Sequence, residues 1–245
     1  MSSQLSHEKR IKSEIAHGKK LSANAEKVWH WEGSIGRARY KRRVKFLSSA
    51  LRNGVKCLEV GCGTGLFTQD LVKSGADITA IDISADLLEH AKKKVPNVTF
   101  LEKDACYTGF PDESFDVVVG SSILHHLDID LSLKEIYRIL KKDGTLWFTE
   151  PNYLNPHVYL ERRVEFLRIK LGVSEYETAF VRWPLAKKLK ETGFTSVEVK
   201  PFDFLYPFLP ENCLAFMEKV GMLTEQIPLI KEIAGSLQIT ATKSV

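Results

Sequence analysis

The 245-residue sequence lacks any apolar run that approaches the roughly 20 residues needed to span a bilayer. Its first ten residues are polar and do not form the apolar core of a secretory signal peptide. Its four cysteines form no CxxC pair and suggest no disulfide framework. We therefore expect a cytoplasmic protein in a reducing compartment, without a transmembrane segment.

Acidic residues are scarce at the N-terminal end. Residues 1–53 carry 13 Lys and Arg against four Glu and no Asp, a local charge of +9, although the whole chain carries only +4. A solvated helical face explains such a stretch. Contact with phosphate on an anionic lipid, a nucleotide-sugar or a nucleic acid explains it equally well. Peripheral contact with an anionic membrane surface is therefore one expectation for this stretch.

Beyond residue 53, short β-rich runs alternate with helical patterns. The predicted strands are 55–60, 78–82, 97–101, 115–119 and 145–149. Helices are expected between them, at 66–73, 84–94 and 131–142. This alternation is typical of βαβ units in a doubly wound parallel sheet. We predict one domain over residues 53–245, preceded by a helical, basic arm or cap over residues 1–52.

The alternation of strand and helix patterns ends after residue 150. A helical insertion is expected at about 152–182, with amphipathic helical character over 154–171. A helix at 183–192, a strand at 195–200, a helix near 211–222 and a last strand at 237–241 complete the predicted domain.

Glycine is concentrated in one segment, Glu59-Val60-Gly61-Cys62-Gly63-Thr64-Gly65, at the end of the first predicted strand. A tight turn from strand to helix needs residues without Cβ, which reach unusual φ values and allow a ligand to approach the backbone. The following helix N-terminus offers free N–H groups. Asp82 ends the next strand, 21 residues after Gly61, where a carboxylate can accept both hydroxyls of a ribose. Together these features predict a nucleoside site.

A dinucleotide site fits the turn less well. The GxGxxG fingerprint requires a third glycine where this chain has Leu66. The pair Tyr137-x-x-x-Lys141, which short-chain dehydrogenases use, falls on a predicted helix and is interpreted as a chance match. An NAD(P)-binding oxidoreductase is therefore the least favoured alternative.

Five segments in register resemble class I S-adenosylmethionine-dependent methyltransferases. Residues 59–65 resemble motif I, 115–122 resemble motif IV, and 140–146 resemble the turn before strand five. The resemblance covers residues 53–150 well and 183–242 in outline. It implies a Rossmann-like α/β fold with a seven-stranded sheet of order 3-2-1-4-5-7-6, whose last strand is antiparallel.

The resemblance also implies S-adenosyl-L-methionine as cofactor and S-adenosyl-L-homocysteine as product. Asp82 would hold the ribose with Ile83 against the adenine, and Asp104 with Ala105 would read the adenine amino group. The implied cofactor-binding set is Glu59, Gly61, Cys62, Gly63, Gly65, Asp82, Ile83, Asp104, Ala105 and Ser121. Simpler roles remain open: Glu59 capping the turn, Cys62 filling it, and Asp104 serving as an ordinary loop carboxylate.

Two histidines follow motif IV, where the family places substrate-facing groups. Histidine is the natural general base at neutral pH. Adjacent side chains point in different directions, so we select His126 as the catalytic base, with His125 and Glu150 as alternatives. A histidine that only packs this loop explains the sequence equally well.

No metal site is expected. Ubiquinone-pathway O-methyltransferases carry acidic residues in this loop, roughly ExLEH, whereas residues 122–126 read Ser-Ile-Leu-His-His. Both acids are therefore missing from this chain.

The acceptor is less clearly indicated than the cofactor. Residues from 150 onward, with 177–183, resemble bacterial methyltransferases of cell-surface glycans and lipids. We expect a small-molecule, glycan or lipid-linked acceptor, methylated on oxygen or nitrogen. A nucleic-acid methyltransferase is the main alternative, but no Asp/Asn-Pro-Pro-Tyr motif and no RNA-binding module are evident. Trp29, Trp31 and the aromatic segment 202–208 are expected to close the substrate entrance.

Overall fold

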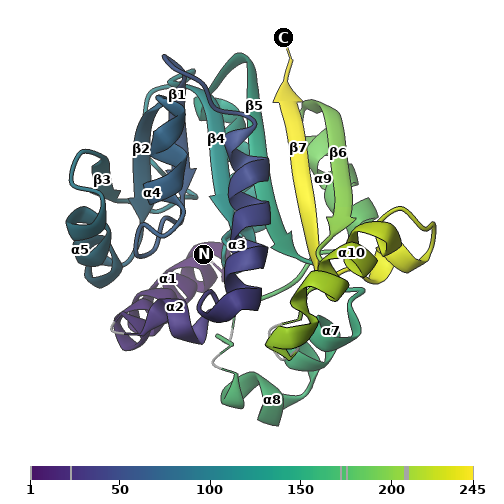
Figure 1. Ribbon diagram of the computed structural model, residues 1–245. Helices are drawn as coiled ribbons and strands as arrows, with labels where there is room; N and C mark the ends of the chain where they lie inside the picture. Colours follow the sequence, from purple (N-terminus) through teal and green to yellow (C-terminus); the bar gives the residue numbers. More distant parts are fainter. Residues whose placement is uncertain (1, 23, 172, 175, 207–209, 245) are drawn as a thin grey trace.

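The computed structural model describes residues 2–22, 24–171, 173–174, 176–206 and 210–244. Its centre is a seven-stranded sheet with helices on both faces (Figure 1). The strands lie in the order β3-β2-β1-β4-β5-β7-β6. Their bounds are β1 Lys56–Val60, β2 Asp77–Asp82, β3 Thr99–Glu102, β4 Phe115–Ser121, β5 Leu140–Pro151, β6 Phe194–Phe202 and β7 Ser236–Lys243.

The first five strands are parallel, and β7 runs antiparallel to both β5 and β6. The predicted sheet order and antiparallel last strand are therefore confirmed. Four of the five residues of β1, Cys57, Leu58, Glu59 and Val60, are buried, so the strand lacks the alternation of a half-exposed strand. The carboxyl ends of the parallel strands meet at one edge of the sheet, the lower edge in Figure 1.

Helices cover both faces of the sheet. The α-helices are α1 Ser2–Leu21, α2 Ala25–Val28, α3 Gly33–Ser48, α4 Thr68–Leu71, α5 Ala85–Lys94, α6 Ile129–Ile139, α7 Pro156–Arg163, α8 Glu165–Lys170, α9 Arg182–Thr192 and α10 Leu214–Thr224. The 3₁₀ helices are η1 Val72–Ser74, η2 Leu124–His126, η3 Glu211–Cys213 and η4 Ile230–Ile233. Helices α3 and α4 pack on one face, through Leu47 and Leu71, whereas α6 and α9 pack on the other.

The N-terminal 52 residues divide into two parts. Helix α3 belongs to the layer over the sheet, because Leu47 is 1% exposed and the Phe46 ring lies 5.0 Å from that of Trp147. Helices α1 and α2, which we call the α1–α2 arm, lie below the sheet at the carboxyl ends of the strands (Figure 1). The domain boundary at residue 52 stays a prediction.

Some observed boundaries differ from the predicted ones. The helix expected over 131–142 ends at Ile139, because Leu140 pairs with Phe115 as the first residue of β5. The expected helix over 154–171 is two helices, since Val164 has extended backbone between α7 and α8. Among the described residues, no helix has the length and apolar character required to cross a membrane.

Candidate functional site

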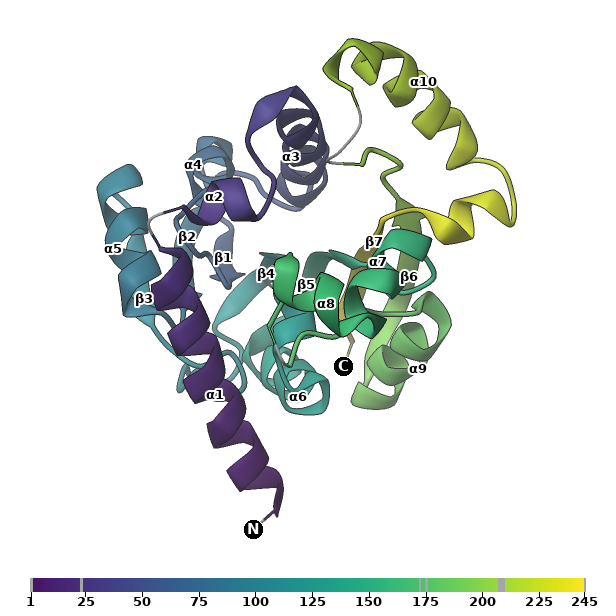
Figure 2. The same cartoon turned by 90° about the horizontal axis from the view of Figure 1, so that it is seen from below.

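A cavity of about 360 Å³ opens at the carboxyl-end edge of the sheet. Its walls come from α1, the glycine turn after β1, the ends of β2 and β4, the loop after β3, and α7. Figure 2 views this edge from below, where the α1–α2 arm, α3, α7, α8 and α10 surround the ends of the strands. The volume falls within the range of roughly 300–1,000 Å³ that is usual for small-molecule sites.

The glycine turn forms one wall of this cavity. Gly61, Gly63 and Gly65 have φ values of +67°, +52° and +74°, a region that residues with a Cβ rarely adopt. A Cβ on Gly61 would lie 2.4 Å from the Ile123 side chain, and one on Gly63 would lie 3.1 Å from the Trp29 ring. The turn therefore needs glycine both for its backbone conformation and for the close approach of its neighbours.

Asp82 ends β2 beside the turn and helps to fix it. Its Oδ2 accepts the Gly63 N–H at 2.8 Å, and its Oδ1 accepts the Ser84 N–H at 2.9 Å. Burial raises the pKa of Asp82 above its ordinary value, although these N–H donors oppose the change. A carboxylate has about four acceptor sites, so two bonds leave capacity for two further donors such as ribose hydroxyls.

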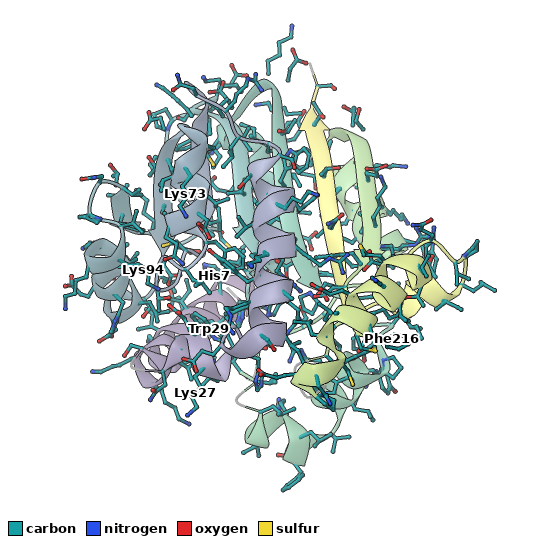
Figure 3. The ribbon with its side chains drawn as sticks, viewed as in Figure 1. His7, Lys27, Trp29, Lys73, Lys94 and Phe216 are labelled. Atoms are coloured by element: carbon teal, nitrogen blue, oxygen red, sulfur yellow. The ribbon has the colours of Figure 1, made fainter. Side chains whose placement is uncertain are left out.

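Asp104 lies in the loop after β3 and contacts the α1–α2 arm. Its Oδ1 accepts the Cys106 N–H at 2.8 Å, and its Oδ2 lies 2.7 Å from His7 Nε2. Figure 3 shows His7 and Trp29 between the arm and the lower ends of the strands. The α1–α2 arm therefore contacts Asp104, the residue that the family resemblance assigns to the adenine.

The cavity brings together most of the predicted site residues. Those that line it are Gly61, Cys62, Gly63, Asp82, Ile83, Asp104, Ala105, Ser121 and His126. Glu59 and Gly65 do not line it. Gly65 is instead pressed against α5, since a Cβ there would lie 3.1 Å from the Ala91 backbone.

Glu59 is 3% exposed in β1, under the glycine turn. None of the described residues offers a hydrogen-bond partner to its Oε2 atom. Burial raises the pKa of Glu59 to about 7. A buried carboxylate with an unsatisfied oxygen is costly unless a ligand or a proton compensates it, so Glu59 fits a place beside a positively charged group.

His125 and His126 differ sharply in their surroundings. His125 Nδ1 lies 2.7 Å from Glu150 Oε2, and the other Glu150 oxygen accepts the N–H groups of Ile123 and Leu124. Burial holds the pKa of His125 well below its usual range, and burial raises that of Glu150 to about 7. His125 and Glu150 are therefore committed to holding the loop after β4.

His126 Nδ1 lies 2.9 Å from Oε2 of Glu14 on α1. Burial alone would lower the pKa of His126, but the hydrogen bond to Glu14 and the charges of Glu177, Glu14 and Glu150 raise it above the ordinary value. The geometry thus gives His126 the stronger basicity of the two histidines.

Sequence reasoning missed the contribution of α1. It gave residues 1–52 only as a helical, basic arm or cap, whereas α1 lines the cavity with His7, Arg10, Glu14 and His17. Their spacing of three or four residues places them on one helix face, and this was the available sequence signal. Glu177, in the segment after α8, also lines the cavity and was missed.

Three arginines of the basic stretch pair with carboxylates within the fold. Arg43 Nη1 donates to Asp203 at 2.7 Å, and Arg39 Nε donates to the same carboxylate at 3.2 Å. Arg42 pairs with Glu225 at 2.7 Å. These arginines therefore tie α3 to the segment after β6 and to the end of α10.

Of the aromatic residues expected at the substrate entrance, Trp29, Trp31 and Tyr206 line the cavity, while Phe208 is outside the described residues.

Within the described part of the chain, two groups of side chains could hold a metal ion. One is His7, Asp104 and Cys106, and the other is His125, His126 and Glu177. In the second group, Arg162 already pairs with Glu177 at 3.0 Å, and Glu14 already contacts His126 Nδ1 at 2.9 Å. These partners already engage two of the three side chains, and the absence of a metal stays a prediction.

The charge of the cavity fits a cationic ligand. Seven carboxylates line it, Glu14, Asp82, Asp104, Asp128, Glu161, Glu177 and Asp203. Five Lys and Arg accompany them, Arg10, Arg39, Arg43, Lys103 and Arg162. S-adenosylmethionine carries a positively charged sulfonium, so the excess of carboxylates and the glycine turn suit that cofactor.

Comparisons with known proteins identify related methyltransferases. A family model described as a methyltransferase domain matches residues 58–148. The 2-phytyl-1,4-naphtoquinone methyltransferase of Nostoc sp. is 30% identical over 194 residues, covering 69% of this chain and 84% of the relative. The demethylmenaquinone methyltransferase of Chlorobaculum tepidum is 39% identical over 167 residues, covering 61% of this chain and 69% of the relative.

The fold has solved counterparts. A structure of an S-adenosylmethionine-dependent methyltransferase from Thermotoga maritima matches with a TM-score of 0.67 and 21% sequence identity, covering 93% of this chain and 100% of that chain. The sheet order, the matched domain and the sequence relatives agree in one assignment. The chain belongs to the class I S-adenosylmethionine-dependent methyltransferases.

Proposed function

We propose that this enzyme methylates a small acceptor with a quinone-type or hydroxylated ring and an apolar tail, and that His126 accepts the proton of the ring hydroxyl. Bound S-adenosylmethionine supplies a methyl group on a positively charged sulfur. Asp82, Asp104 and the glycine turn would hold this cofactor, which would supply the methyl group to the acceptor, and His126 would accept the proton that the hydroxyl loses. The neutral thioether S-adenosylhomocysteine is the product.

The cofactor half of the cavity would be formed by the residues that follow the parallel strands. We assign Asp82 to the ribose hydroxyls, and Ile83, Asp104 and Ala105 to the adenine. The N–H groups and bare Cα atoms of the glycine turn would lie along the amino-acid part. Their support is that these side chains, far apart in sequence, line one cavity.

The observation that carries the choice of base is the contact between His126 and Glu14 at 2.9 Å. A carboxylate on Nδ1 fixes the tautomer whose Nε2 accepts a proton, as in other histidine–carboxylate pairs. His125 is less suited because Glu150 engages its ring and its pKa is depressed.

An apolar tail is favoured by the surface beside the cavity. Fifteen large apolar side chains are exposed in the described part of the chain, and 12 of them belong to residues 159–169 and 216–233. These two segments lie at the carboxyl-end edge of the sheet (Figure 2). The names of the two relatives also point to naphthoquinone-type substrates. Such a tail would also account for peripheral contact with a membrane surface.

The acceptor is tested by measuring S-adenosylhomocysteine release. Candidate substrates are a reduced 1,4-naphthoquinone with a short prenyl tail, its untailed analogue, an ethanolamine and a hexose. We expect turnover with the tailed naphthoquinol, weaker turnover without the tail, and none with the amine or sugar. Turnover restricted to the amine or the sugar would contradict the proposed acceptor.

The base is tested with His126→Gln. Loss of a general base lowers kcat by about 10²- to 10⁴-fold, and we expect a fall in this range with S-adenosylhomocysteine affinity nearly unchanged. His90→Gln, on the exposed side of α5, is the matched control. Full activity of His126→Gln would remove His126 from this role.

A further inference from the structure

We propose that Glu14 of α1 is a positioning residue for His126, whose ring it orients only while α1 lies across the cavity. This inference rests on the proposed role of His126 as the base. It assigns a function in the reaction to an N-terminal helix that lies outside the βαβ core.

The Glu14 carboxylate is held at both oxygens. Oε2 lies 2.9 Å from His126 Nδ1, and Oε1 accepts the Ser174 hydroxyl at 2.8 Å. The Glu14 and His126 side chains are only 13% and 21% exposed, so water screens their interaction weakly. A carboxylate with both oxygens engaged leaves the His126 ring little freedom to rotate.

Other contacts of α1 fix the position of Glu14. Arg10, one helical turn earlier, donates to the backbone carbonyl of Leu127, next to His126. His7, one further turn away, lies 2.7 Å from Asp104. One face of α1 therefore contacts the loop of the base and the carboxylate assigned to the adenine.

The far end of α1 is seated on α5. A Cβ on Gly18 would lie 2.7 Å from the Ser84 hydroxyl oxygen, so the two helices approach closely at this glycine. Leu21 of α1, Ala25 of α2 and Leu87 of α5 form a buried apolar cluster. Because α1 is anchored at both ends, Glu14 reaches His126 only in the docked position of the helix.

Several charged groups face His126. Glu14 and His17 come from α1, Glu177 from the segment after α8, Glu150 from the end of β5, Asp82 from the end of β2, and His125 is its neighbour. Glu14 alone among these is within hydrogen-bond distance of the His126 ring in the described part of the chain. Removing the Glu14 charge therefore takes away both a direct bond and a nearby negative charge, which lowers the pKa of His126.

The test uses the full-length protein and two readouts. The pKa of His126 is measured by NMR of histidine-labelled wild type, Glu14→Gln and Glu14→Asp. The pH profile of kcat/KM is measured for the same proteins. Glu8→Gln, at an exposed position of the same helix, is the matched control.

We expect Glu14→Gln to lower the His126 pKa by about one unit and to lower the plateau of kcat/KM. A base acts unprotonated, so activity rises with pH through its pKa, and the acid limb of the profile should move to lower pH by the same amount. Glu14→Asp should restore part of the shift, and Glu8→Gln should behave like wild type.

An unchanged His126 pKa in Glu14→Gln would overturn the inference, as would an equal shift in Glu8→Gln. The NMR readout needs no turnover, so the inference and the proposed function fail separately. If His126→Gln were fully active while Glu14→Gln still shifted the pKa, the base assignment would fail and the Glu14 contact would stand. Hydrogen exchange of α1 would establish whether the helix stays docked in each variant.

Discussion

Gly63 occupies the point where the glycine turn meets the α1–α2 arm. Its φ is +52°, and a Cβ there would lie 3.1 Å from the Trp29 ring on the cavity wall. Gly54 offers a comparison, since its φ is +80° but a Cβ there would have no heavy atom within 4 Å. The two glycines thus separate backbone strain from the loss of ligand space.

We expect Gly63→Ala to weaken S-adenosylhomocysteine binding at least tenfold and Gly54→Ala to leave it unchanged. Left-handed backbone costs a residue with a Cβ about 1–2 kcal/mol, so both variants should lose thermal stability, Gly63→Ala more because its Cβ would also crowd the Trp29 ring. Isothermal titration calorimetry and thermal unfolding separate the two effects. Equal affinities in both variants would mean that the Gly63 backbone does not border the cofactor.

The sequence identified residues in contiguous motifs and missed those supplied from a distance. Several site residues follow successive strands at characteristic positions, so short sequence motifs are enough to locate them. They are Gly61, Gly63, Asp82 and Asp104. Glu14 meets His126 across 112 positions of the sequence. No local sequence pattern predicts the contact between Glu14 and His126, because the contact depends on where α1 docks.

At the scale of elements, local chemistry predicted some helix boundaries and missed others. The helix expected over 84–94 is α5, where the Ser84 side chain caps the helix and accepts the Leu87 N–H. The end of α6 was placed three residues too late, because the pairing of Leu140 with Phe115 outweighs the helical pattern. Long-range strand pairing is not visible in the periodicity of a single segment.

Docking of α1 on α5 can be tested at Gly18. We expect Gly18→Val to increase hydrogen exchange throughout α1 at least tenfold, because its Cβ would meet Ser84. Valine is a better helix former than glycine by a few tenths of a kcal/mol, so faster exchange would report lost docking and not a weaker helix.

Ala16→Val, at an exposed position of the same helix, is the control and should exchange like wild type. Unchanged protection of α1 in Gly18→Val would show that the contact with α5 is dispensable. The exchange measurement depends on neither cofactor nor acceptor.

At the scale of the whole molecule, the resemblance to a family predicted the sheet order, while the surface around the cavity could not be predicted. Apolar residues of α7, α8 and α10 show helical spacing, which in most helices marks a buried face. In this fold many of them are exposed, including Phe166 and Ile169 of α8 at 70% each and Phe216 of α10 at 67%. Only the tertiary arrangement distinguishes these exposed faces from core.

This surface gives a last prediction, that the protein binds lipid vesicles through residues 159–169 and 216–233. Both segments carry exposed apolar side chains. Their helices lie at the carboxyl-end edge of the sheet (Figures 1 and 2), where the cavity opens and a tailed acceptor would leave a membrane. Burial of one large apolar side chain contributes about 1.5–3 kcal/mol.

The double change Phe166→Ser and Ile169→Ser should therefore lower the partitioning of the protein onto phosphatidylcholine–phosphatidylglycerol vesicles at least tenfold, as measured by flotation. The same change should not lower the turnover of an untailed acceptor. Tyr107→Ser, which removes an exposed ring (61%) outside both segments, should have no such effect. Equal partitioning of all three proteins would exclude these helices as the membrane-facing surface.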